Sequence, residues 1–205
     1  MATDDGPRKR ARIYFAFRSP YSRLGLHIAA RAGLADAPGV EVHPFTGPPD
    51  GVAFQDPVAN KLKLAYYGED APRMTSRLGL EMRAPRPFEV DVSAANKAAV
   101  AAALDGVGLA FAIAVSDARW GEGRNVSEID VLRAAAEAAG WRAARVDEAQ
   151  ADPRVAERLE ASRTAIAKDR AFGVPFAVIE TADGAMRRYW GHDRFDLFVE
   201  DYAAA

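Results

Sequence analysis

A chain of 205 residues with 49% hydrophobic content is long enough for one globular domain with a sizeable core, or for one domain that carries a large insertion. Its 27 Lys and Arg against 29 Asp and Glu leave a formal charge of −2, which gives no electrostatic reason to expect binding to nucleic acid or to an anionic membrane. The absence of cysteine excludes disulfides, zinc–thiolate sites and a thiol nucleophile supplied by the protein.

Other common sites also lack support in the sequence. The three histidines, His27, His43 and His192, do not show the spacing of metal ligands on a helix, so we expect no metal site. No GxGxxG, P-loop or GxSxG motif occurs, and no segment approaches ~20 uninterrupted apolar residues. We therefore expect a cytoplasmic protein that takes small-molecule ligands and has neither a nucleic acid nor a membrane partner.

The N-terminal part of the chain predicts a tail, a strand and a helix. Residues 1–11 are polar and basic, and we expect the cations of residues 9–12 to be solvated. The apolar run from Ile13 to Phe17 predicts a strand, and the segment after it predicts a helix that ends near Gly33.

The start of this first helix is the most informative position in the chain. Ser19 is placed as the N-cap and Pro20 as the first helical residue, so the Ser19 hydroxyl lies among unpaired N–H groups at the positive end of the helix dipole. Such a position can bind an anion. A purely structural cap is the alternative, and these residues alone leave both interpretations open.

The middle of the chain predicts helices. Alternation from Val40 to Phe45 indicates a second strand, residues 46–51 break regular structure, and almost no strand signal follows until Phe176. Ser127 with Asp130 is typical of a capping box, and Asp152–Pro153 of a helix start. Gly140 and Gly173 follow expected helix ends. The expected helices cover residues 58–78, 94–105, 109–120, 128–139 and 154–171.

Strand patterning returns at the C-terminal end. Residues 176–180 and 186–190 flank an Asp-Gly turn and predict a hairpin, and residues 193–202 predict an amphipathic helix. Strand-helix-strand at one end and strand-strand-helix at the other is the layout of an α/β thioredoxin-like fold with a large inserted all-helical domain. We therefore predict a thioredoxin-like domain from residues 12–48 and 172–205, an inserted helical domain at 49–171, and a tail at 1–11.

Several motifs along the chain resemble those of 2-hydroxychromene-2-carboxylate isomerases and kappa-class glutathione transferases, relatives of DsbA-type disulfide oxidoreductases. They are residues 13–22, Lys63-Leu64-Ala65-Tyr66 with Asp70 and Arg73, Trp120-Gly121-Glu122-Gly123, Phe172-Gly173-Val174-Pro175, and Tyr189-Trp190-Gly191-His192-Asp193-Arg194. The resemblance implies a cis proline at Pro175, opposite the helix N-terminus. It also places Ser19 and Ser22 where DsbA-type relatives have cysteines, and a serine pair cannot exchange disulfides.

The resemblance further implies that the thiol comes from outside, as bound glutathione or another low-molecular-weight thiol whose sulfur lies beside the catalytic Ser19. The backbone of Val174, before Pro175, would pair with this tripeptide as an added strand. Trp190, Gly191, His192 and Asp193 would hold its γ-glutamyl end, with Asp193 near the ammonium group. Two alternatives remain open, in which Asp193 is only the N-cap of the last helix and Trp190 belongs to the core.

The implied substrate is a small conjugated electrophile, in contact with Arg18, Tyr21 and Asn96. Arg18 would bind a carboxylate or form a surface salt bridge, and Asn96 would bind substrate or be solvated. Ala16 stands where many relatives carry Asp, and the loop from Gly47 to Asp56 lacks the Lys of aromatic-degradation isomerases, so another conjugated acid is expected.

The expected function is a thiol-dependent cis-trans or ring-opening isomerase. A glutathione transferase or thiol-dependent reductase and a non-catalytic thioredoxin-fold binding protein are the alternatives. Relatives of this kind often dimerise, so a homodimer is one expectation.

Overall fold

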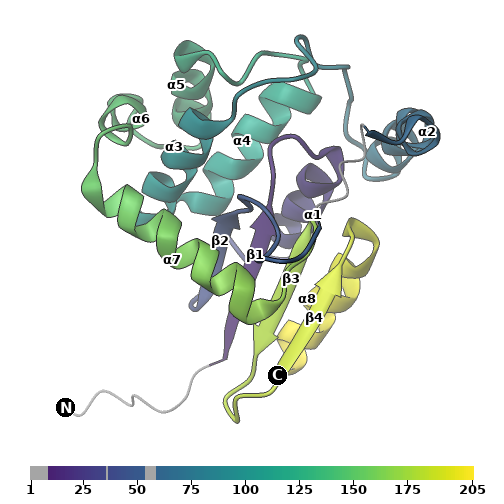
Figure 1. Cartoon of the computed structure of the whole chain (residues 1–205), viewed down its shortest axis with the longest axis vertical. Helices are drawn as coiled ribbons and strands as arrows, with labels where there is room; N and C mark the ends of the chain where they lie inside the picture. Colours follow the sequence, from purple (N-terminus) through teal and green to yellow (C-terminus); the bar gives the residue numbers. More distant parts are fainter. Residues whose placement is uncertain (1–8, 36, 54–58) are drawn as a thin grey trace.

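The sheet is assembled from both ends of the chain (Figure 1). The computed structural model describes residues 9–35, 37–53 and 59–205, and within them four strands form one mixed sheet in the order β2-β1-β3-β4. β1 pairs in parallel with β2 and antiparallel with β3, and β3 pairs antiparallel with β4. The strands are β1 Arg10–Phe15, β2 Val40–Pro44, β3 Phe176–Glu180 and β4 Met186–Trp190. This arrangement confirms the predicted fold class.

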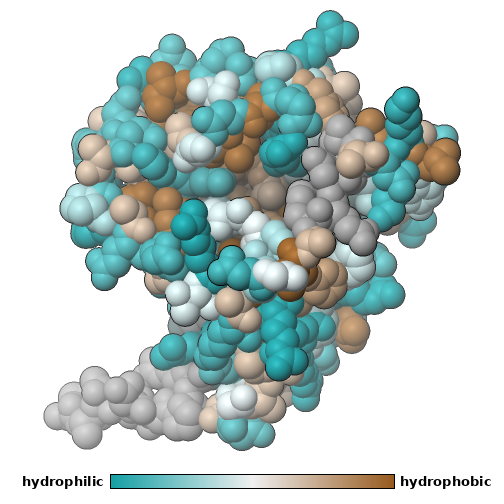
Figure 2. Space-filling view, in the orientation of Figure 1, coloured by the Kyte–Doolittle hydropathy of each residue, from teal (hydrophilic) through white to brown (hydrophobic). Residues whose placement is uncertain are grey.

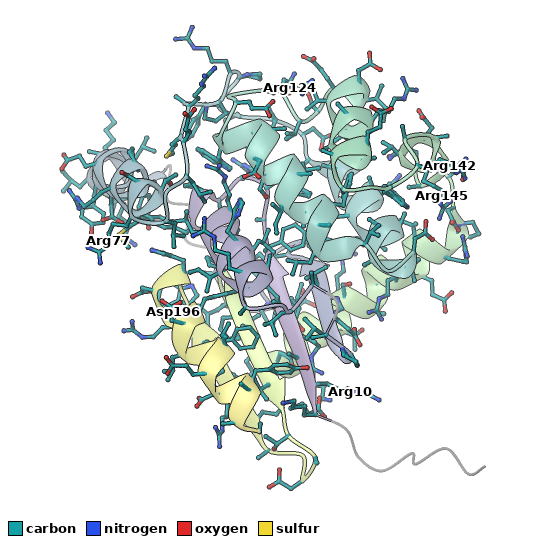
Figure 3. The ribbon with its side chains drawn as sticks, turned by 180° about the vertical axis from the view of Figure 1, so that it is seen from behind. Arg10, Arg77, Arg124, Arg142, Arg145 and Asp196 are labelled. Atoms are coloured by element: carbon teal, nitrogen blue, oxygen red, sulfur yellow. The ribbon has the colours of Figure 1, made fainter. Side chains whose placement is uncertain are left out.

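The described part of the chain contains eight helices, of which α2 stands apart from the sheet (Figure 1). In Figures 1 and 3, which show opposite sides, α1 and α8 cover one face of the sheet and α7 crosses the other. Gly25 lets α1 approach α8 closely, because a Cβ there would lie 3.0 Å from the Phe195 ring. The helices are α1 Pro20–Arg31, α2 Lys61–Arg77, α3 Ser93–Leu104, α4 Gly108–Trp120, α5 Ile129–Ala138, α6 Ala144–Glu148, α7 Pro153–Asp169 and α8 Phe195–Ala204, with a 3-10 turn, η2, at His192–Arg194.

A buried ion pair ties α7 to the sheet. Arg12 donates to Asp169 through Nε at 2.6 Å and Nη2 at 2.9 Å, and the Tyr14 hydroxyl donates to the same carboxylate at 2.6 Å. Arg12 is 8% exposed, so the expectation that the cations of residues 9–12 are solvated is wrong for it. β1 also begins at Arg10 rather than Ile13, because its pairing with β3 extends to Glu180.

One hydrophobic core runs from the sheet into the helical part. Ile13 and Phe15 of β1 belong to the same buried cluster as Ala98 of α3 and Phe111 of α4. The alanine-rich sequence of α3 and α4 allows these helices to lie close together, because small side chains keep interhelical distances short. The helical part therefore packs directly onto the domain that carries the strands.

Some local predictions are wrong. α6 was not expected, and Ser127 does not cap α5, because its N–H and hydroxyl both donate to Asn125 Oδ1, at 3.1 and 2.7 Å. α7 ends at Asp169, two residues earlier than expected, and its C-cap residue Arg170 takes the left-handed conformation. The Asp152 N-cap of α7 is confirmed. The first residue of the predicted 58–78 helix lies outside the described residues, and α2 begins at Lys61 with Asn60 as its cap.

The face of the molecule that Figure 2 shows, in the orientation of Figure 1, is largely hydrophilic. Two large side chains of α2 are nevertheless exposed, Leu62 at 85% and Tyr66 at 55%. None of the helices in the described ranges is long and apolar enough to cross a membrane.

Candidate functional site

Ser19 caps the N-terminus of α1 directly after β1. Its Oγ accepts a hydrogen bond from the Ser22 N–H at 3.1 Å, and its own N–H donates to the Ala16 carbonyl oxygen at 3.0 Å, which closes the turn. The Tyr21 amide has no partner among the described residues. Because the Ser19 oxygen accepts the capping bond, the hydroxyl proton stays free to donate to an anion at this positively polarised terminus.

Ser22 is not placed to act as a second residue of the candidate site. It is fully buried, and its Oγ accepts a hydrogen bond from the Ala16 N–H at 3.1 Å. The hydroxyl therefore ties the helix to the end of β1 and does not face a ligand.

The loop before β3 lies at the same edge of the sheet as Ser19. The Val174–Pro175 peptide is cis. Tyr14 pairs with Phe176 in the antiparallel ladder. Ala16 and Val174 each lie two residues beyond this pair, so both stand at the same edge of the sheet. The Val174 N–H and carbonyl have no hydrogen-bond partner in the part of the chain that the structure describes. This backbone is therefore free to pair with an extended peptide, as the family resemblance implies.

Tyr21 joins three parts of the site. Its ring stacks on His192 with centroids 5.0 Å apart at 19°, and it meets the Tyr67 ring edge-on at 5.7 Å. Its hydroxyl donates to Asp70 Oδ2 at 2.8 Å, and Asp70 also pairs with Arg73 at 3.0 Å. Burial, helped by the bond to Asp70, raises the pKa of Tyr21, so the phenol stays protonated and a hydrogen-bond donor at neutral pH.

The segment after β4 is fixed to the cis-proline loop. The Gly191 N–H donates to the Pro175 carbonyl oxygen at 2.9 Å, and His192 follows on the Tyr21 ring. Burial lowers the pKa of His192, and its Nε2 is buried with no partner among the described residues. The imidazole is therefore neutral at neutral pH.

Asp193 does not cap the last helix. α8 has Arg194 at its N-cap position with no side-chain capping bond, and the Asp193 carboxylate pairs with Arg194 at 2.8 Å. The alternative of a simple N-cap is therefore wrong. The Asp193 side chain is more than half exposed, so its carboxylate remains accessible.

Trp190 is not a core residue. It is 56% exposed, and its ring lies 4.9 Å from the ring of Phe172, which is itself 47% exposed. Gly173 permits this contact, because a Cβ there would lie 3.1 Å from Trp190 Nε1. Two exposed aromatic rings therefore flank the cis-proline loop and offer an apolar surface beside it.

Arg18 directly precedes Ser19, and Arg119 lies at the end of α4. Arg18 forms an ion pair with Glu89, in which both side chains are about half exposed, so the surface salt bridge expected as the alternative for Arg18 is present. Arg119, at the end of α4, is 1% exposed and donates from Nη2 to the Phe88 carbonyl oxygen at 2.5 Å. The next residue, Trp120, donates from Nε1 to the Phe17 carbonyl oxygen at 2.8 Å.

Asn96 stands apart from these residues. It lies half-buried on α3, where neighbouring Lys97 donates to the Gln150 carbonyl oxygen at 3.2 Å. Within the described ranges no hydrogen bond or ring contact links Asn96 to Ser19 or Tyr21, so the structure does not gather it into the site.

A hollow of about 490 Å³ lies elsewhere, between α1, α4 and α5. Alanines such as Ala30 and Ala135 line most of it. The Asp117 carboxylate at its wall is occupied by Arg23 at 2.6 Å and His27 at 2.8 Å. Ala30 is about 16 Å along α1 from the N-cap, and the residues that line the hollow include none of the candidate-site residues described above.

The comparisons with known proteins identify the family and the fold. The sequence model of the DSBA-like thioredoxin domain matches residues 11–203. The chain belongs to this family. No curated protein matches it in a sequence comparison.

Three solved structures show the likeness of fold. A 2-hydroxychromene-2-carboxylate isomerase is 22% identical with a TM-score of 0.69, covering 95% of this chain and 94% of its own. A probable DsbA oxidoreductase from Streptomyces coelicolor is 24% identical with a TM-score of 0.69, over 95% and 88%. The cytosolic disulfide reductase DsbM from Pseudomonas aeruginosa, solved with GSH, is 18% identical with a TM-score of 0.67, over 96% and 100%. At these identities the likeness establishes the fold of the DsbA-like family.

Proposed function

We propose that this protein is a glutathione-dependent isomerase of a conjugated, carboxylated small molecule. The observation that carries the proposal is the Ser19 hydroxyl, which accepts the α1 capping bond and keeps its proton for an anion. The chain has no cysteine, so the anion that fits a thioredoxin-type site here is the thiolate of an external thiol.

The magnitudes are sufficient for thiol activation. A free thiol has a pKa near ~8.5, so only a few per cent is thiolate at neutral pH. Lowering that pKa by ~2 units needs roughly 2.7 kcal/mol of preferential binding of the thiolate. A charge-assisted hydrogen bond from Ser19 supplies about 1.5–3 kcal/mol and the helix terminus about 0.3–1 kcal/mol.

The surroundings of Ser19 fit a tripeptide. The backbone of Val174, which has no hydrogen-bond partner among the described residues, would pair with its extended main chain, and the accessible Asp193 carboxylate would bind its ammonium group. Trp190 and Phe172 would cover its apolar parts. The similar DsbM structure contains GSH, which supports a glutathione site in this fold.

The reaction requires no redox change. The thiolate adds to the far carbon of a C=C–C=O system, and the electron pair of the double bond moves onto the carbonyl oxygen as an enolate. The former double bond is now single and rotates. The enolate then expels the thiolate and restores the alkene with changed geometry, so glutathione is regenerated.

The test is a mass-balance experiment with 2-hydroxychromene-2-carboxylate and other conjugated acids, with and without glutathione. Isomerised product with an unchanged glutathione concentration is the expected result. Consumption of one thiol per product would instead identify a transferase. Glutathione binding without turnover of any conjugated electrophile would identify a non-catalytic binding protein.

A further inference from the structure

Arg119 is a buried cation with unused donors. Arg119 is 1% exposed, and among the described residues Nη2 is hydrogen-bonded only to the Phe88 carbonyl oxygen. Nε and Nη1 are buried without a partner among the described residues. The Trp120 ring lies 5.2 Å from the guanidinium, and Glu89 is within electrostatic range, but no carboxylate among the described residues forms an ion pair with Arg119. A buried guanidinium without a paired carboxylate is costly, so such a group is expected to meet an anion in the working state of the protein.

The surroundings of Arg119 bring it to the edge of the thiol site. Arg119 binds the carbonyl of Phe88, and Trp120 binds the carbonyl of Phe17, so the end of α4 holds two segments side by side. The next residue along each segment is charged, and these two residues, Glu89 and Arg18, form an ion pair with each other.

The local charges do not balance. Among the described residues, the charged groups that act on Arg119 are Arg18 and Glu89, so two guanidinium groups share one carboxylate. Burial and the repulsion of Arg18 lower the pKa of Arg119 to about 10, while Glu89 opposes this, so the three groups lie within electrostatic range and Arg119 is charged at neutral pH. Glu89 is 56% exposed on its side chain and can leave Arg18 at little cost.

We propose that Arg119 and Arg18 form a binding site for the carboxylate of a small organic acid, and that the Glu89 carboxylate occupies the Arg18 side of it when no ligand is bound. Guanidinium groups suit carboxylates because their donors lie in one plane and stay charged. Arg18 directly precedes Ser19, so a carboxylate held here lies next to the position proposed for the thiolate. This inference rests on the proposed function for the ligand's role as substrate.

The experiment measures carboxylate binding without thiol. Calorimetric titration compares trans-cinnamate and sorbate, an aromatic and an aliphatic conjugated acid, with their neutral amides. We expect the wild type to bind at least one acid about tenfold or more tightly than its amide, since a charge-assisted bond is lost in the amide. Arg119→Met is expected to remove this preference, and the Arg119 Nε–H signal in ¹H–¹⁵N spectra should shift when the acid binds.

Glu89→Gln is the variant that does not threaten folding, because the side chain is exposed. Removing the internal carboxylate should strengthen binding of the acid severalfold and leave the amide unchanged. Equal binding of acids and amides by the wild type, or an unchanged acid affinity in Glu89→Gln, would overturn the proposal. Acid binding with these responses but without thiol-dependent turnover would support this site and count against the proposed isomerase.

Discussion

The backbone N–H of Gly191 donates a hydrogen bond to the carbonyl oxygen of Pro175, with the two atoms 2.9 Å apart. This bond joins the segment after β4 to the loop before β3. The residues proposed to hold the γ-glutamyl end of glutathione therefore stand in a fixed relation to the backbone proposed to pair with its main chain. His192 extends the link to α1 through its stack on Tyr21.

Gly191→Ala is expected to destabilise the protein. Gly191 has φ +90° and ψ 144°, a region that only glycine adopts readily, and a Cβ there would lie 2.6 Å from Asp193 Oδ1. We expect a loss of about 1–3 kcal/mol of unfolding free energy, measured by urea denaturation, together with weaker glutathione binding.

Gly184→Ala is the matched control for backbone strain alone. Its φ is also positive, at +83°, but a Cβ there meets nothing within 4 Å. It should lose stability and keep glutathione affinity. Equal affinity losses in both variants would show that the Gly191 position has no special relation to the thiol site.

Ser19→Ala should lower turnover far more than stability. Loss of the hydroxyl removes about 1.5–3 kcal/mol of thiolate stabilisation, so the rate should fall about tenfold to a hundredfold or more, whereas a lost cap costs about 1 kcal/mol of folding free energy. Ser19→Gly separates the two effects, since glycine caps helices at a cost of only a few tenths of a kcal/mol. Full activity in either variant, assayed with saturating glutathione, would contradict thiolate activation by Ser19.

Ser22→Ala should act on stability. Its buried hydroxyl accepts from the Ala16 N–H, and removal leaves that donor unpaired at a cost of about 1–3 kcal/mol. Once folded, the variant should retain the kcat and the glutathione KM of the wild type. A rate loss like that of Ser19→Ala would mean that Ser22 also faces the bound thiol.

The sequence predicted the strands well because their signal is local. The runs at 176–180 and 186–190 match β3 and β4 residue for residue, since apolar patterning and an Asp-Gly turn depend only on neighbouring residues. The ion pair between Arg12 and Asp169 joins residues far apart in the chain, and nothing local to either residue predicts it.

The candidate site likewise contains features that neighbouring residues in the sequence predict and features that they do not. Ser19 as the N-cap follows from its own pentapeptide, and the cis proline at Pro175 was implied only by resemblance. Arg119 was missed because its significance depends on burial and on contacts with Phe88 and Arg18, which a sequence motif does not show. The one available signal was its place directly before the Trp120-Gly121-Glu122-Gly123 motif.

His192 should make the protein less stable in mild acid. Burial holds its pKa below the ordinary value near ~6.5, so the unfolded chain binds a proton at a pH where the folded protein does not. The stability contributed by neutral His192 is thus complete above about pH 6.5 and is lost as the pH falls through the folded-state pKa. His192→Gln should lose less unfolding free energy than the wild type between pH 7 and pH 5.

Asp193→Asn provides the complementary measurement. The Asp193 charge partly raises the pKa of His192, so its removal should deepen the acid loss of stability. If the pH dependence of urea unfolding is the same in the wild type and His192→Gln, the imidazole is not the group responsible.

S-methylglutathione should inhibit the enzyme and fail to replace glutathione. Its sulfur cannot ionise or add to an alkene, while its peptide part can still pair with Val174 and reach Asp193. We expect inhibition competitive with glutathione, and weaker inhibition in Asp193→Asn, because the contact to the ammonium group is lost. Asp196→Asn is the matched control, since Asp196 lies at the start of α8 (Figure 3) and is also exposed.

Full activity of dialysed enzyme, shown by mass spectrometry to carry no thiol, would mean that Ser19 itself or an acid–base pair performs the chemistry. The fold would then be retained without the thiol mechanism proposed for it.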